Sequence, residues 1–125
     1  YYQLFEDYKN HENELNIKDF DFPSLPGSAK AINEGEENGL AFSCVSVPVE
    51  LHHAQKIVII NHEDCGAYGG SVKFNNDEKL EQEFHEKELN KAKKKILGKY
   101  PDKEIILIYA KLVDEKEGIE FVVVS

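Results

Sequence analysis

Apolar runs alternate with charged segments along the chain, and three of these runs have the length and composition of β-strands. Every residue from Ile57 to Ile60 is β-branched, which is typical of an interior strand of a parallel sheet, buried on both faces. Two further strands are predicted at 104–112 and 119–124, joined by the turn sequence DEKEG. A short alternating pattern at Phe20 and Phe22 runs into prolines and a glycine, which predicts a strand passing into a loop.

The strongest helix signal covers residues 76–99. Acidic residues crowd the start of this segment and lysines crowd its end, which matches the helix dipole, and Gly98 and Pro101 are typical stop signals. The lysine run 93–95 is interpreted as a solvated helix end rather than a binding patch. The face predicted to be buried consists of Leu80, Phe84, Leu89, Ala92 and Ile96.

Two less regular segments are also predicted to be helical. Residues 1–15 have apolar side chains on one face among acids and amides. Residues 40–54 repeat both like a helix and like a strand, and a helix disturbed by Pro48 is favoured because another strand follows almost at once. Helices and strands in this order predict one domain over residues 1–125, a small three-layer α/β sandwich with a mainly parallel central sheet.

Charge and composition exclude several classes of partner. The chain of 125 residues has a formal net charge of −9, which argues against binding to nucleic acid or to anionic membranes, since both attract basic surfaces. No apolar run approaches the length of a membrane-spanning helix, and no secretion signal is seen, so the cytoplasm is the expected location. The cysteines Cys44 and Cys65 are too few for a disulfide framework.

The candidate chemistry lies in the stretch VIINHEDCGAYGG, where the predicted strand 57–60 runs into His62 and Cys65. Ligands in open α/β sheets bind at the carboxyl ends of strands, and both residues lie just past such an end. Imidazole and thiolate are good zinc ligands, and an H-x-x-C loop can bring both to one ion.

The neighbouring residues of this loop have plausible supporting roles. Asp64 and Glu63 are candidates to orient the histidine, or they simply face water. Gly66 removes a side chain directly behind the cysteine, and Gly69 and Gly70 allow a tight turn.

Spacing alone leaves two other interpretations open. In a purely structural one, Cys65 is a small buried residue and His62 an ordinary loop histidine. In the other, Cys65 is the nucleophile of a metal-free thiol enzyme, but such enzymes usually use an arginine to bind an anionic substrate, and all 15 basic residues here are lysines.

The stretch IVIINHEDCGAYGG resembles the second metal motif of the β-class carbonic anhydrases, in which a buried strand ends in H-x-x-C-G. The resemblance extends to LPGSAKAIN, to residues 40–55 and to the closing strands, and therefore spans nearly the whole chain. It implies that His62 and Cys65 are zinc ligands, with Nε2 and Sγ within roughly 4 Å of each other as in a tetrahedral site.

The sequence departs from this family at the first metal motif, C-x-D-x-R, which supplies a further cysteine and an aspartate–arginine pair. Cys44 is a poor substitute, because CVSV has neither the aspartate nor the arginine, and it is interpreted as a core residue. We expect the motif, and with it the first strand of the sheet, immediately upstream of Tyr1, since the chain does not begin with methionine. The competing interpretation is a protein that has lost both the motif and the activity.

The resemblance implies a zinc-dependent lyase that hydrates carbon dioxide reversibly to bicarbonate, with Zn²⁺ making hydroxide available at neutral pH. It also implies a homodimer or higher homo-oligomer, weakly supported by the aromatic residues Tyr1, Tyr2, Phe5 and Tyr8. The alternative is an inactive binding or structural domain, whose pocket Tyr68 would crowd. As proton shuttles the sequence offers His52, His53 and His85, unless these are ordinary surface histidines.

Overall fold

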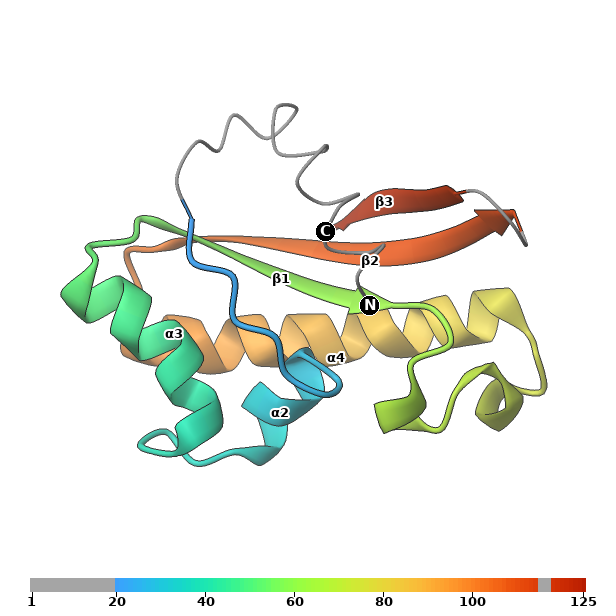
Figure 1. The fold of residues 1–125 in the computed structure, drawn as a ribbon, viewed down its shortest axis with the longest axis horizontal. Coiled ribbons are helices and arrows are strands. Elements are labelled where there is room, and N and C mark those ends of the chain that lie inside the picture. Colours follow the sequence, from blue (N-terminus) through green and yellow to red (C-terminus); the bar gives the residue numbers. More distant parts are fainter. Residues whose placement is uncertain (1–19, 115–117) are drawn as a thin grey trace.

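A computed structural model describes residues 20–114 and 118–125, which form a three-stranded sheet with helices packed against one face (Figure 1). The strands are β1 (Lys56–His62), β2 (Glu104–Asp114) and β3 (Gly118–Val124), in that order across the sheet. β1 and β2 are parallel, with Ile59 opposite Leu107, and β2 and β3 are antiparallel. The three predicted strands are therefore confirmed, and the fold is α/β.

The finer predictions about the sheet are not confirmed. Of the two strand pairs one is parallel and one antiparallel, and the described residues form two layers rather than three. The prediction that Ile57 to Ile60 form an interior strand is wrong for the described sheet, because its middle strand is β2. Along β1 only Ile59 and Asn61 are fully buried. A β-branched run favours a strand, but it does not determine how many neighbours that strand has.

The long helix α4 (Glu78–Lys99) follows β1 and precedes β2 in the chain, and it runs along one face of the sheet. It confirms the helix predicted over 76–99. Asp77 caps it by accepting a hydrogen bond from the Leu80 amide at 3.1 Å. At its C-terminal half the predicted face is correct, since Leu89, Ala92 and Ile96 are fully buried.

At the N-terminal end of α4 the predicted face is wrong. Leu80 is 48% exposed, Phe84 is half-buried, and the fully buried positions are Glu81 and His85. Positions 81, 85 and 89 follow one another at a spacing of four and lie on one side of a helix. In this part of α4 the apolar residues Leu80 and Phe84 therefore do not lie on the helix face that packs against the sheet.

Two shorter helices precede β1. α3 (Leu40–Leu51) confirms the helix predicted there, with Pro48 in its last turn and the partly buried Cys44 in its middle. α2 (Ala29–Glu34) has only six residues. The Lys95 ammonium group donates to the carbonyl oxygens of Ile32, at 2.7 Å, and of Gly35. The last lysine of the predicted solvated run thus caps a neighbouring helix.

The core lies between the helices and the sheet. Its largest fully buried side chains include Phe42, Leu89, Ile96, Leu107 and Tyr109. None of the helices within 20–114 and 118–125 has the length and apolar character to cross a membrane. The helix predicted over residues 1–15 lies outside the described residues, and Phe20 and Phe22 lie in irregular backbone rather than in a strand.

Candidate functional site

The predicted site residues lie where β1 ends and its loop begins. His62 is the last residue of β1, at the same edge of the sheet as the end of the parallel part of β2. Cys65 precedes a short 3₁₀ turn (Gly66–Tyr68), and a second such turn (Ser71–Phe74) leads towards α4. The expected strand-end position is therefore confirmed for both residues.

The glycines of the loop differ in what they do. Gly69 and Gly70 have φ values of +97° and +74°, the left-handed region that favours glycine, so the predicted tight turn is confirmed. A Cβ at Gly66 would meet no atom within 4 Å. Beyond its chain neighbours, Gly66 therefore faces open space, and its expected role directly behind the cysteine stays a prediction.

The half-buried His62 ring has a defined hydrogen-bonding direction. Its Nδ1 lies 2.8 Å from the carbonyl oxygen of Glu63, which can only accept, so Nδ1 carries the hydrogen and donates it. The lone pair of Nε2 is then free for a metal ion. A backbone carbonyl that fixes the tautomer in this way is a common second partner of metal-binding histidines.

The acidic residues expected to orient His62 do so only through the backbone of Glu63. The Asp64 carboxylate instead accepts a hydrogen bond from the Ser71 amide at 2.8 Å. One oxygen of the Glu63 carboxyl group is buried and has no hydrogen-bond partner within the described part of the chain. Burial, followed by the nearby negative charges of Glu81 and Glu78, raises the pKa of Glu63.

The metal ligands that the described residues offer are of the types that zinc prefers, but there are too few of them for a zinc site. Cys65 is 5% exposed and is a free thiol, and with His62 it offers one sulfur and one nitrogen ligand. Across residues 20–114 and 118–125, no three side chains of histidine, cysteine, aspartate or glutamate gather as a metal site. A zinc site built on His62 and Cys65 therefore needs a third protein ligand beyond the described residues.

Behind the loop lies a buried polar network that the sequence analysis missed. Asn61 accepts a hydrogen bond from the Ala29 amide at 3.1 Å through Oδ1. Its Nδ2 therefore faces His85 and donates to Nδ1 of that ring at 3.0 Å. Asn61 thus ties the start of α2, the end of β1 and the first half of α4 together.

His85 is a buried residue, so its interpretation as an ordinary surface histidine is wrong, and its role as a proton shuttle stays a prediction. Its side chain is fully enclosed, and Nε2 has no hydrogen-bond partner within the described residues. Burial, followed by electrostatic interaction with the nearby His62 and Lys73, lowers its pKa to about 4. The ring is neutral at pH 7. His52 and His53, by contrast, are exposed, and His52 is hydrogen-bonded to Asp21 at 2.6 Å.

The carboxyl group of Glu81, 1% exposed, lies between this network and the loop. It accepts hydrogen bonds from the Asp64 amide and from the Ser71 hydroxyl, each at 2.7 Å. Its Oε2 lies 3.8 Å from Nε2 of His85. The only sequence signal was the spacing of 81, 85 and 89 on one helix face.

Tyr68, predicted to crowd the pocket, is part of the packed wall beside His85. Its ring stands edge-on to the His85 ring with the centroids 4.9 Å apart. Its hydroxyl donates to Glu88 at 3.2 Å, and burial raises its pKa further above the ordinary value. The tyrosine is thus held in place by residues of α4.

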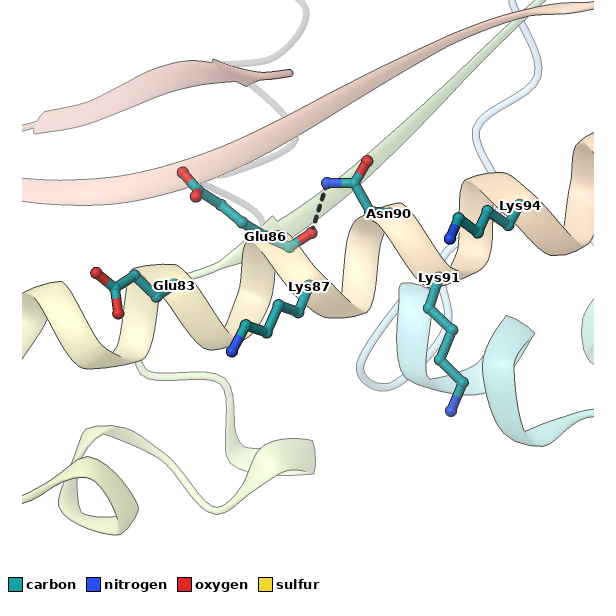
Figure 2. A pocket seen from close by; sticks show the side chains of 6 residues that line it. All are labelled: Glu83, Glu86, Lys87, Asn90, Lys91 and Lys94. Carbon is teal, nitrogen blue, oxygen red and sulfur yellow. Dashed lines mark hydrogen bonds between the residues drawn. The ribbon is translucent and has the colours of Figure 1, made fainter.

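A hollow of about 460 Å³ lies elsewhere on α4 and is not a second candidate (Figure 2). The side chains of Glu86 and Asn90 point away from those of Lys87 and Lys91 (Figure 2). Asn90 is occupied by a hydrogen bond to the Glu86 carbonyl at 2.9 Å. Charged side chains that point to different sides of a helix are typical of contact with solvent rather than of one binding site.

Comparison with known proteins assigns the chain to a family. Residues 8–123 match the family described as "Putative carbonic anhydrase". An uncharacterised protein of Rickettsia bellii (strain RML369-C) is 34% identical over 93 residues, which cover 70% of this chain and 56% of that protein. An uncharacterised protein of Rickettsia conorii (strain ATCC VR-613 / Malish 7) is 30% identical over 111 residues, 83% of this chain and 59% of that protein.

The chain spans between half and two thirds of the length of these two curated relatives. No solved structure matches the sequence significantly. The family match covers almost all of the chain and includes the loop with His62 and Cys65. The chain therefore belongs to this carbonic anhydrase family.

Proposed function

We propose that the protein is a zinc-dependent carbonic anhydrase that interconverts carbon dioxide and bicarbonate, with His62 and Cys65 as two of its zinc ligands. The observation that carries the proposal is the hydrogen bond from Nδ1 of His62 to the Glu63 carbonyl oxygen. It leaves Nε2 as a free donor, three residues before a free thiol at the carboxyl end of a strand.

The third ligand in this proposal is the cysteine of a C-x-D-x-R motif ahead of Tyr1. Zinc, when bound, supplies the Lewis acidity that lets water ionise near neutral pH for attack on carbon dioxide. His62 and Cys65 hold the ion, the Glu63 carbonyl keeps the imidazole in the binding tautomer, and the thiol gives up its proton on binding.

The test compares two versions of the protein, one with this sequence and one extended by the upstream C-x-D-x-R motif. Zinc is measured by elemental analysis and hydration of carbon dioxide by stopped flow. We expect little zinc and poor hydration in the short version, because two ligands hold zinc weakly. The extended version should bind zinc near stoichiometrically and hydrate carbon dioxide.

Matched substitutions in the extended version test the two ligands. His62→Ala and Cys65→Ser should each lose zinc and activity. Cys44→Ser and His53→Ala replace the other cysteine and an exposed histidine, and they should retain both properties. Robust hydration by the short version would identify another third ligand, with Cys44 the first candidate. An extended version with neither zinc nor activity would favour the binding-domain interpretation.

A further inference from the structure

The loop that contains Cys65 is bonded at both of its ends to one buried carboxyl group, that of Glu81. Glu81 accepts a hydrogen bond from the Asp64 amide and another from the Ser71 hydroxyl, each at 2.7 Å. These two residues flank the segment 65–70. A single side chain on α4 therefore fixes both ends of the loop. The two ends are also bonded directly to each other, because the Ser71 amide donates a hydrogen bond to the Asp64 carboxylate.

The conformation at Asp64 needs this support. Its φ of +57° lies in the left-handed region, which a residue with a side chain adopts at a cost. The turn directly after Cys65 also depends on close contacts, because Gly70 lies so near Asp64 that a Cβ would come within 3.0 Å of its carboxylate oxygen. Strained backbone of this kind persists when the surrounding structure holds it.

Glu81 itself occupies a position where a carboxyl group is costly. It is 1% exposed, on the helix face that otherwise packs Leu89, Ala92 and Ile96 against the sheet. Burying a polar group is unfavourable unless hydrogen bonds replace its contacts with water. Here both replacing bonds come from the site loop, so the carboxyl group serves the loop rather than the packing of α4.

We propose that Glu81 is a positioning residue, whose carboxyl group holds the loop from Asp64 to Ser71, and with it Cys65, in its observed conformation. The zinc part of this inference rests on the proposed function. The loop part rests on the two hydrogen bonds alone, so it can be measured in the absence of metal.

The central experiment is Glu81→Gln in the full-length protein, with alkylation followed by mass spectrometry on the peptide that contains Cys65, so that Cys44 and the cysteine of the proposed upstream motif do not contribute. Glutamine keeps the shape, but an NH₂ group replaces one of the two oxygens that accept from the Asp64 amide and from the Ser71 hydroxyl, so one of these two bonds is lost or has to reverse its direction. Alkylation of Cys65 by iodoacetamide in metal-free protein reports opening of the loop, because the thiol is buried. We expect the rate to rise at least about tenfold.

The second measurement is zinc affinity, which should weaken by about 10- to 100-fold in Glu81→Gln, as for other residues that orient metal ligands. Glu83→Gln is the matched control, since Glu83 is exposed on the same helix. Val49→Ala is a control for general destabilisation, because Val49 is buried in α3. Both controls should keep the alkylation rate and the zinc affinity of the parent protein.

The outcomes separate the two proposals. Faster alkylation of Glu81→Gln in a protein that binds no zinc would support the positioning role and reject the proposed function. Unchanged alkylation and zinc affinity in Glu81→Gln would overturn the positioning role, as would an equal change in Val49→Ala. If Glu81→Gln does not fold, Ser71→Ala removes one of the two bonds at a half-buried position and should raise the alkylation rate in the same direction.

Discussion

At the scale of single residues, the side chains that shape the candidate site are polar groups placed inside the protein. Asn61 uses both ends of its amide, accepting from Ala29 and donating to His85. His85 accepts that bond only while its Nδ1 is unprotonated. The geometry and the low pKa of His85 therefore agree that the buried ring is neutral, and this makes it a source of pH-dependent stability.

His85 should make the folded protein less stable in weak acid. Its pKa falls from an ordinary value of 6.5 to about 4 in the folded state, so between these values the unfolded chain binds a proton that the folded protein does not. The neutral His85 therefore contributes about 3 kcal/mol to the free energy of unfolding above about pH 6.5, and this contribution is lost as the pH falls towards 4.

Urea unfolding of the wild type, His85→Gln and the exposed His53→Gln at pH 7 and in weak acid measures this contribution. The wild type and His53→Gln should lose stability to a similar extent on acidification. His85→Gln should lose less, because glutamine does not titrate. An equal loss in all three proteins would assign the acid sensitivity to other groups.

At the scale of secondary-structure elements, α4 organises the described domain. It runs along the sheet, covers it with Leu89, Ala92 and Ile96, and contributes Glu81 to the loop. The buried positions of its N-terminal half are the polar Glu81 and His85, and those of its C-terminal half are the apolar Leu89, Ala92 and Ile96. Both sets lie on the same side of the helix, but the first makes hydrogen bonds to the loop and to Asn61, and the second packs against the sheet. The two halves should therefore respond differently to the same substitution.

Leu89→Ala and Leu80→Ala test which face of α4 is buried. Leu89 is fully buried, so its truncation should lower the free energy of unfolding by about 2–5 kcal/mol. Leu80 is 48% exposed, so the same change should cost less than about 1 kcal/mol. Urea unfolding curves of both variants decide the matter, and a larger loss from Leu80→Ala would favour the face predicted from the sequence.

Which elements could be predicted follows from how local their signals are. The β-branched run at 57–60 and the capped pattern of α4 predict their own structure, and both elements were predicted correctly. The position of β1 in the sheet and the rotation of α4 at Glu81 depend on residues distant in sequence. The motif placed His62 and Cys65 at a strand end, but a buried glutamate bound to the loop leaves no local pattern of polarity.

At the scale of the whole molecule, a homodimer or higher homo-oligomer remains a prediction. It rests on the family resemblance and on aromatic residues at the N-terminus that lie outside the described part of the chain. Light scattering on the full-length protein measures the mass. We expect at least twice the mass of one chain, and a monomer would contradict the prediction.

The parallel pairing of β1 with β2 has a consequence for the order of folding. β2 and β3 follow each other closely in the chain, whereas β1 reaches β2 only after the loop and the whole of α4 have been traversed. Closing the longer connection costs more chain entropy, so β1 should dock after the β2–β3 hairpin has formed.

The amide of Glu63, which bonds to the Ala110 carbonyl at 2.9 Å, reports this docking step in pulsed hydrogen exchange. It should become protected later than the amides that pair β2 with β3, and simultaneous protection would contradict this order. His62 and Cys65 lie at the end of the strand that arrives last. On this pathway a zinc ion bound at the proposed site would meet a nearly completed domain, so it would stabilise the folded protein rather than direct the folding of the chain.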